Sequence, residues 1–379
     1  MVAAADTAIY VHIPFCRTRC AYCDFNTYVG LEALLPAYVE ALCAEIAAAP
    51  AVRAGTLYFG GGTPSLLRPE QAGAVLETAR PALGLPPDVE VTLEANPGTV
   101  DGEKLRHLRR LGVSRLSLGV QSARDDELRL LGRRHRWADV LQAVQAARTA
   151  GFDNLNLDLI YGLPGQRLEQ WQHTLQAALA LAPEHLSLYA LTVEPKTALA
   201  ARIAAGELPP PDEDHAAAMY EWSQRALAAA GFLQYEISNW ARDSSFVCRH
   251  NLTYWRNEPY LGFGAGAASW WGGRRWSNTS HPAAYIEQVG EGGSAVDDEE
   301  AISRPLEMGE TMMMGLRLVE GVSEERFRSR FGQGLVDVFG AELRLLSGLG
   351  LLEWDGRAAR LTPRGRLLGN QVFQHFLPG

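Results

Sequence analysis

The 379-residue sequence has no apolar run long enough to cross a membrane and no low-complexity tract. A membrane-spanning helix needs about 20 consecutive apolar residues. Clusters of lysine and arginine are missing as well, and the net charge is −9. Because an extended nucleic-acid interface needs such clusters, tRNA modification is disfavoured and we expect no nucleic-acid partner. The first residues show neither the basic segment nor the cleavage pattern of a secretory leader, so we expect a cytoplasmic protein in a reducing environment.

Two common nucleotide-binding fingerprints are also absent. The glycine cluster GGGTP at residues 60–64 follows an apolar run, but no GK[ST] follows it and the spacing GxGxxG is not met. The cluster is therefore neither a Walker loop nor a dinucleotide fingerprint. Glycine lets backbone amides approach a ligand closely, so the cluster remains a candidate ligand contact of another kind.

Short apolar runs alternate with longer amphipathic stretches from residue 8 to about residue 191. This alternation is typical of repeated βα units around a parallel sheet. It predicts an α/β fold, either a barrel or an open doubly wound sheet. We expect six strands, at residues 8–13, 56–59, 89–94, 115–120, 155–160 and 185–191.

Composition divides the rest of the chain. Three prolines break the pattern at residues 209–211, and residues 240 to about 290 are rich in Trp, Gly, Asn and Ser. We expect a core at 1–240, a connecting segment at 241–297 and a C-terminal domain at 298–379. In the last of these, Asp355-Gly356 predicts a hairpin turn, and the run Met312 to Met314 is interpreted as helix core. A winged-helix DNA reader fits this pattern, but the acidic chain favours an accessory or lid domain.

Three cysteines stand in one short loop, Cys16, Cys20 and Cys23 in CRTRCAYC, and no second cysteine pair follows them. Three thiolates can hold three irons of a four-iron cluster, whereas a closed site would use four. One iron would then be open to a small molecule. The alternative is a structural zinc site with His12 as fourth ligand. The zinc site is disfavoured because His12 lies inside a strand-like run. Zinc motifs also usually contain two pairs of Cys or His ligands, with a longer gap between the pairs.

Polar or glycine-rich residues stand at or near the carboxyl ends of the predicted strands, which is the edge where α/β proteins bind ligands. The glycine cluster follows the second strand, and Glu94, Gln121, Asp158 and Tyr189 lie at later ones. We expect them to line one mouth with the cysteine loop. Carboxylate, amide and guanidinium groups, including Arg133 in LGRRH, suit a zwitterion and ribose hydroxyls.

Six stretches together resemble the family of oxygen-independent coproporphyrinogen III oxidase and its relatives in the radical S-adenosylmethionine (SAM) superfamily. The resemblance runs from about residue 8 to residue 285, and a C-terminal domain of the same family follows. It implies a partial (β/α)6 TIM-like barrel of parallel strands with a small, mostly helical C-terminal domain. The stretches are YVHIPFCRTRCAYCDF, YFGGGTPSLL, LEANPG, SLGVQS, LGRRH and LDLIYGLPGQ.

The resemblance also implies a [4Fe-4S] cluster on the three cysteines, with the amino and carboxylate groups of SAM on the open iron. Tyr22 would pack its ring near the adenine side. The other residues that the resemblance places around SAM are Tyr10, Gly61, Gly62, Thr63, Glu94, Gln121, Arg133 and Asp158.

Two departures separate this chain from the oxidase it resembles. Phe25 stands where the oxidase has a further cysteine, and only 15 residues precede the cluster loop. CDFN and the segment CRHNLTYW instead resemble the HemW branch of heme chaperones, which is associated with an HNxxYW heme-binding motif. Heme, heme-accepting client proteins such as respiratory ones, and an electron donor are the partners that this branch implies. Oxidation of coproporphyrinogen III by a radical from SAM is the alternative.

His250, within HNxxYW, would be the heme ligand in that branch, with Tyr254 and Trp255 as flat surfaces for the macrocycle. Without the resemblance, His250 is interpreted as a hydrogen-bonded structural histidine. Cys248 lies two residues away on what we expect to be an extended segment, so it would point to the same side. It is interpreted as a small buried thiol.

Overall fold

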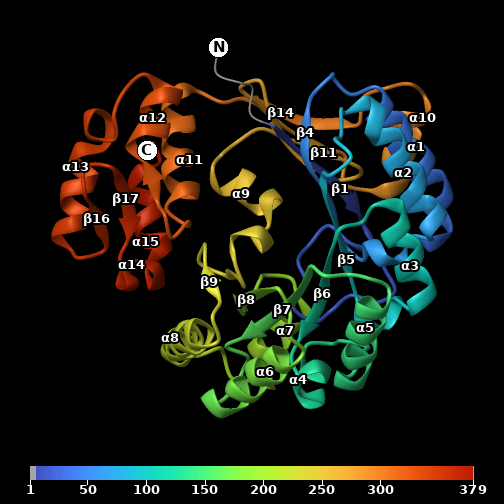
Figure 1. Ribbon diagram of the computed structural model, residues 1–379, viewed down its shortest axis with the longest axis horizontal. Coiled ribbons are helices and arrows are strands. Elements are labelled where there is room, and N and C mark those ends of the chain that lie inside the picture. The colour runs from blue at the N-terminus through green and yellow to red at the C-terminus, as the bar shows by residue number, and fades with distance from the viewer. Residues whose placement is uncertain (1–5, 379) are drawn as a thin grey trace.

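Six parallel strands form the centre of the structure, and they are paired in the order in which they follow along the chain. The computed structural model describes residues 6–378. The strands curve into a partial barrel (Figure 1), as the family resemblance implies, and not into an open doubly wound sheet. They are β1 (Thr7–Ile13), β4 (Ala54–Gly61), β5 (Glu90–Ala95), β6 (Arg115–Gln121), β7 (Leu155–Tyr161) and β8 (His185–Ala190).

Each central strand has one apolar and one polar face. In β6, Leu116, Leu118 and Val120 are fully buried in the core, and they alternate with Arg115 and Ser117. Since successive strand residues point to opposite faces, one set packs under the helices and the other lines the inside of the barrel. This polar lining is unusual, because barrel interiors are commonly filled with branched apolar side chains.

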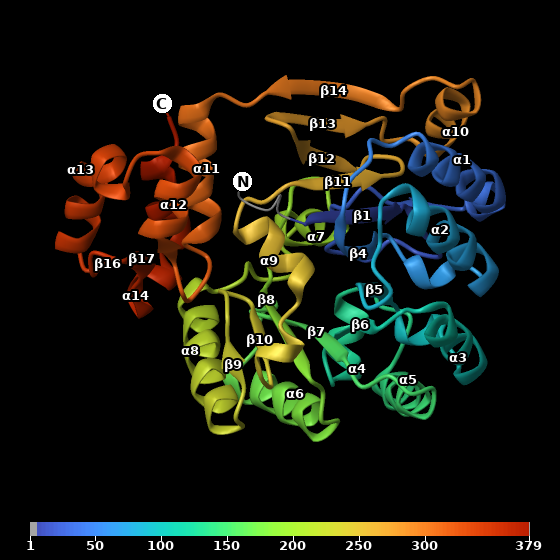
Figure 2. The same cartoon turned by 45° about the horizontal axis from the view of Figure 1, so that its top comes forward.

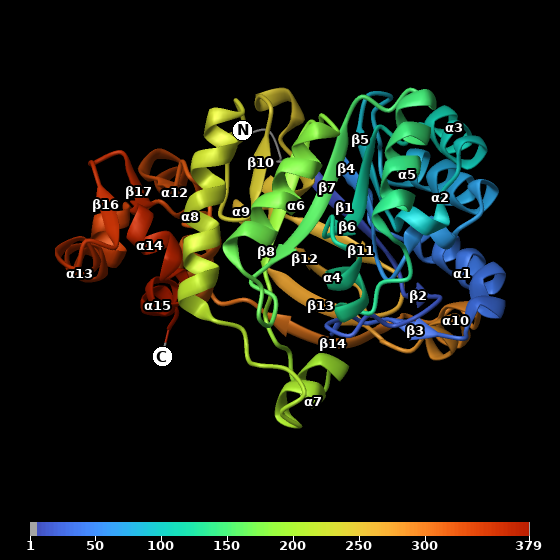
Figure 3. The same cartoon turned by 90° about the horizontal axis from the view of Figure 1, so that it is seen from below.

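Amphipathic helices cover the outer face of the sheet, and Figure 3 shows several of them in a layer beside the strands. Their apolar faces join the main hydrophobic core. The helices that connect the central strands are α1 (Leu35–Ala47), α2 (Pro69–Ala82), α3 (Gly102–Leu111), α4 (Asp125–Leu130), α5 (Trp137–Thr149) and α6 (Leu168–Ala180).

Further strands extend the sheet at both edges to 12 strands in total. At one edge β11 pairs with β1 in parallel, and three antiparallel strands follow it (Figure 2). The segment at 241–297 thus supplies sheet strands, which its composition did not predict. The added strands are β9 (Leu233–Gln234), β10 (Asn239–Ala241), β11 (Tyr260–Phe263), β12 (Ala268–Trp271), β13 (Arg274–Asn278) and β14 (Val296–Ala301).

Helices outside the βα units flank this sheet, and no helix among residues 6–378 is long and apolar enough to pass through a bilayer. The helices are α7 (Ala198–Ala204), α8 (Glu213–Ala229), α9 (Arg249–Trp255) and α10 (Pro282–Gly290).

The prediction of an extended segment around His250 is wrong, because residues 249–255 form helix α9. Its N-terminus is anchored by Glu90, whose carboxylate accepts hydrogen bonds from the backbone N–H groups of Arg249 (3.2 Å) and His250 (3.1 Å). Negative charge is favourable at a helix N-terminus. Cys248 is fully buried at the N-cap, as expected of a structural thiol.

The C-terminal region has its own hydrophobic core. The predicted turn at Asp355-Gly356 is confirmed between β16 and β17, which pair antiparallel. Met312 is buried in this core and Met313 packs against it, and Met313 and Met314 also line a cavity of about 230 Å³ beside Tyr254. The elements are α11 (Arg304–Gly315), α12 (Glu324–Phe331), α13 (Leu335–Gly348), α14 (Pro363–Leu367), α15 (Gly369–Phe373), β15 (Val322–Ser323), β16 (Leu352–Trp354) and β17 (Ala358–Leu361).

Candidate cluster and cofactor site

The cysteine loop begins directly after β1, at the carboxyl end of the strand. Cys16 ends the short strand β2 (Phe15–Cys16), which pairs with β3 (Tyr28–Val29). Cys16 is buried, whereas Cys20 and Cys23 are half-buried. A cluster on these thiols would therefore lie at the surface of the barrel mouth with one side covered by protein.

The glycine cluster lies against this loop. The Thr63 hydroxyl is 3.4 Å from Cys16 Sγ. A Cβ atom on Gly62 would lie 3.0 Å from that sulfur and 2.7 Å from the Phe15 carbonyl oxygen. Such separations are too short for ordinary packing, so only glycine allows this close approach. Gly61 has φ +111°, a conformation that also favours glycine.

Arg133 reaches the same loop from the segment after α4. Its Nη1 donates to Cys20 Sγ at 3.4 Å and its Nη2 to the Gly119 carbonyl at 2.7 Å. Tyr22 packs beside Leu131 in a small apolar cluster, and burial raises the pKa of its phenol although the nearby Arg133 lowers it.

The donor set fits an iron–sulfur cluster. The Thr63 hydroxyl lies within hydrogen-bond distance of Cys16, and Cys20 receives a hydrogen bond from Arg133. Hydrogen bonds to cluster sulfurs are a normal part of such sites and help to set their reduction potential.

Two carboxylates line the polar inner face, Glu94 on β5 and Asp158 on β7, the strands on either side of β6. Tyr58 donates a hydrogen bond to Glu94 at 2.8 Å. Burial, and next the charge of Asp158, raise the pKa of Glu94 to about 7. Burial likewise raises the pKa of Asp158. The two groups thus share a region of low polarity where a positively charged ligand group would be favourable.

Asp158 is held by neighbours that the motif comparison did not single out. Ser117 donates to its Oδ2 at 2.9 Å and Asn156 to its Oδ1 at 2.8 Å. Ser117 and Asn156 both lie on the polar face of their strands. The alternation of polar and apolar residues in these strands was therefore the sequence signal that could have identified them as neighbours of Asp158. These bonds fix the carboxylate while leaving lone pairs for a ligand hydroxyl.

Gln121 ends β6 in a strained conformation. Its φ is +69°, which is uncommon for a residue other than glycine, and the pairing with β7 shifts register between Gly119 and Gln121. A Cβ atom on Gly119 would be 3.0 Å from both Gln121 Nε2 and Arg133 Nη2. The two side chains therefore lie together over Gly119, at the mouth.

Tyr10 lies deeper, on the inner face of β1. Its hydroxyl is 3.0 Å from His12 Nδ1, and its ring stacks on that of Tyr58 with centroids 6.3 Å apart. His12 Nε2 is 2.9 Å from the Asn26 carbonyl oxygen. Since both ring nitrogens of His12 are engaged elsewhere, the geometry does not favour it as a fourth metal ligand.

His250 lies apart from the cysteine loop, at the opposite end of the strands. Its Nδ1 is 2.8 Å from the hydroxyl of Thr56, near the start of β4, and its Nε2 is 3.1 Å from the hydroxyl of Tyr254. The ring is buried, and burial, with a smaller effect of Arg115, lowers its pKa to about 3. His250 is therefore neutral at physiological pH.

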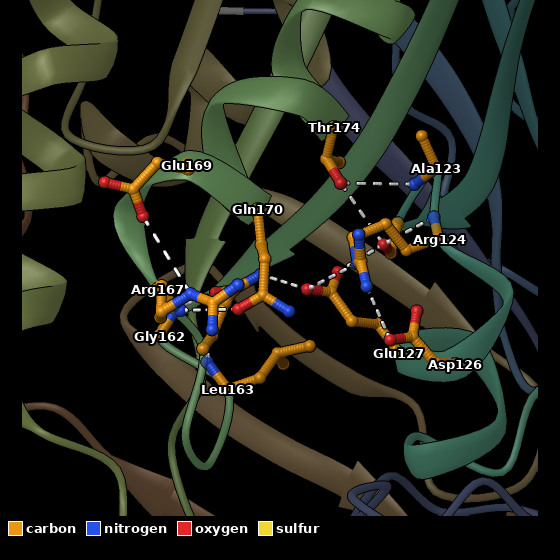
Figure 4. A network of polar contacts seen from close by, with 12 residues as sticks. Ala123, Arg124, Asp126, Glu127, Gly162, Leu163, Arg167, Glu169, Gln170 and Thr174 are labelled. Atoms are coloured by element: carbon orange, nitrogen blue, oxygen red, sulfur yellow. Dashed lines mark hydrogen bonds and ion pairs between the residues drawn. The ribbon is translucent and has the colours of Figure 1, made fainter.

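Another buried carboxylate, Glu127, was missed by sequence reasoning. It is 6% exposed and joins the loop after β6 to the loop after β7 (Figure 4). Its contact with Gln166 spans 39 positions in the sequence, and a charge at the start of a helix ordinarily indicates only a favourable helix end.

Comparison with known proteins agrees with this geometry. The radical SAM superfamily matches residues 10–178, and the HemN C-terminal domain matches residues 302–368. The coproporphyrinogen III oxidase HemN of Escherichia coli has a similar solved structure, with a TM-score of 0.85 and 28% identity over 98% of this chain and 90% of that chain. Together with the cysteine loop, these matches define a radical SAM protein with a HemN-type C-terminal domain.

Full-length relatives narrow the family. The heme chaperone HemW of Bacillus subtilis is 41% identical over 97% of this chain and 98% of its own length. HemW of Mycobacterium tuberculosis is 39% identical over 97% of this chain and 94% of its own length. The mitochondrial radical S-adenosyl methionine domain-containing protein 1 of Mus musculus is 38% identical over 99% of this chain and 88% of its own length. The chain belongs to the HemW family.

Proposed function

We propose that this protein is a heme chaperone that binds heme and delivers it to heme-requiring proteins, on a scaffold that carries a [4Fe-4S] cluster and SAM. The observation that carries the proposal is its similarity over nearly the full length to proteins named heme chaperone HemW. The absence of a fourth cysteine at Phe25, which is 62% exposed beside the loop, agrees with this branch.

The cofactor site is assigned to the mouth of the barrel. Cys16, Cys20 and Cys23 would hold the cluster, which supplies an open iron for the amino and carboxylate groups of SAM. Arg133 orients a carboxylate beside Cys20 through its fork of donors, while Glu94 and Asp158 accept from ammonium or hydroxyl groups. The SAM contacts are assigned to Tyr10, Tyr22, Gly61, Gly62, Thr63, Glu94, Gln121, Arg133 and Asp158.

Heme is assigned to the region of α9, with His250 as an axial ligand. In the structure His250 is bound to Thr56 and Tyr254. Ligation through His250 therefore requires α9 to release at least one of these contacts, and a site that must give up its heme is suited to such an exchange. The parts at 1–240, 241–297 and 298–379 would serve as the radical SAM core, the HNxxYW segment and the HemN-type domain. The remaining partners are an electron donor and client proteins in the cytoplasm, respiratory ones among them.

The alternative is oxygen-independent oxidation of coproporphyrinogen III, and it is supported by the structural similarity to HemN. Anaerobic incubation of the reconstituted protein with coproporphyrinogen III, SAM and reductant tests the two functions. We expect no protoporphyrinogen, and transfer of bound heme to an apo-form heme protein in a parallel reaction. Steady formation of protoporphyrinogen would replace the chaperone by the oxidase.

A further inference from the structure

The backbone at Gln121 forms a tight turn that the sequence alone does not stabilise. Ser122 N–H donates to the Val120 carbonyl at 2.9 Å, which closes a three-residue turn with Gln121 at its centre and φ at +69°. Turns of this hand are rare and strained. Strained positions persist only where the surroundings fix them, and they occur mainly at functional sites.

The residues that fix this turn meet at Glu127. Ser122 donates to Glu127 Oε2 at 2.5 Å, and Gln166 Nε2 donates to Oε1 at 3.1 Å. Gln166 Oε1 in turn accepts from the backbone N–H of Gly162 at 2.8 Å. One buried carboxylate thereby joins the loop after β6 to the loop after β7 (Figure 4).

Neighbouring contacts complete the clamp. Thr174, on α6, accepts from the backbone N–H of Ala123 at 3.3 Å, and Arg124 Nε lies 3.6 Å from Glu127. A buried carboxylate that lost these donors would be costly, so the network forms as a unit. The network reaches the chain at Ser122, one residue beyond Gln121. The carboxamide of Gln121 lies beside the guanidinium of Arg133.

We propose that Glu127 is a positioning residue for the SAM site: it holds the strained turn at Gln121 and so keeps the Gln121 carboxamide aimed at the ligand. This rests on the proposed binding of SAM at the barrel mouth. Glu127 itself does not touch the ligand, and it acts through Ser122 and Gln121. Glutamine at position 127 keeps the shape but loses the charge. Its NH2 group either faces the donor Nε2 of Gln166 or forces the Ser122 hydroxyl to accept instead of donate, so the charge-assisted bonds that hold the turn are weakened.

A double-mutant cycle on the cluster-reconstituted protein tests this, with the dissociation constant of SAM measured by equilibrium dialysis. Glu127→Gln should weaken SAM binding about tenfold, which corresponds to about 1.4 kcal/mol, while iron content is kept. In the Gln121→Ala background the same change should alter SAM binding less than about twofold, because residues that act as a unit are non-additive.

Glu184→Gln is the matched control. Glu184 accepts from Arg148 at 2.9 Å and from the Leu155 backbone N–H at 3.0 Å, at the start of β7 and away from the mouth. The Glu184→Gln variant should bind SAM as tightly as the unmodified protein. An unaffected Glu127→Gln variant, or an equal loss with and without the Gln121 side chain, would overturn the positioning role. Failure of the unmodified protein to bind SAM would instead overturn the proposed cofactor site, and the positioning role with it.

Discussion

Arg133 Nη1 lies 3.4 Å from Cys20 Sγ, although 113 positions separate the two residues in the sequence. The contact places a guanidinium beside a thiol that would hold the cluster, where it could bind the carboxylate of SAM. Arg133→Lys keeps the charge but loses the planar fork. We expect about tenfold weaker SAM binding, about 1.4 kcal/mol, measured by equilibrium dialysis. The neighbouring exposed Arg134→Lys is the control, and equal affinities for the two variants would contradict the assignment.

The approach of Gly62 to Cys16 gives a second prediction. In Gly62→Ala the new Cβ meets the backbone carbonyls of Phe15 and Ile13 and also Cys16 Sγ, and the two carbonyls cannot move freely. We expect a loss of about 1–3 kcal/mol in the free energy of unfolding and reduced iron content after anaerobic reconstitution.

The control for this variant is Gly348→Ala, which adds a methyl group where no atom lies within 4 Å. Iron content equal to that of the unmodified protein in Gly62→Ala would show that the glycine cluster does not shape the cysteine loop.

Glu94 makes stability depend on pH. Burial raises its pKa from 4.5 to about 7, so the fold favours the protonated form. This stabilisation is fully present below pH 4.5 and is lost as the pH rises through 7. Glu94→Gln stays neutral and should therefore raise the free energy of unfolding of the cofactor-free protein at pH 8 by up to about 3 kcal/mol.

Urea denaturation at pH 5 and pH 8 measures this effect. The gain should fall to about 1 kcal/mol or less at pH 5. Glu77→Gln, at an exposed position of α2, should show no difference between the two conditions. A Glu94→Gln variant that is less stable than the unmodified protein at pH 8 would reverse the predicted sign.

His250 supports α9 whether or not it binds heme. His250→Ala leaves the hydroxyls of Thr56 and Tyr254 without their partner, and we expect a loss of about 2–4 kcal/mol in the free energy of unfolding. Thermal and urea unfolding measure it, with the exposed His375→Ala as control. Unchanged stability would mean that the imidazole is not held as the structure shows.

Much of the fold was predictable because the signal was local and periodic. The six central strands lie within about two residues of their expected positions, since alternating apolar residues define each buried face. The strands after residue 255 were missed because Trp, Gly and Arg residues there show no such period. Helix α9 was mistaken for an extended segment because its first turn is stabilised by Glu90, which is far away in sequence.

The site was predictable in part for the same reason. Cysteine spacing and the glycine cluster are contiguous motifs, and the structure brings Cys16, Thr63 and Arg133 together at one mouth. The sequence could not show that Glu127 clamps the turn at Gln121, because the network around it joins two loops with Thr174 of helix α6. Nor could it show that both nitrogens of His250 are already bonded.

An anaerobic heme titration of the reconstituted protein, followed by absorbance, tests the proposed chaperone function most directly. We expect saturable binding with a defined spectrum, which His250→Ala weakens or alters under conditions where that variant remains folded. Absorbance that rises without saturation and is the same in both proteins would contradict heme binding and return the coproporphyrinogen oxidase to first place.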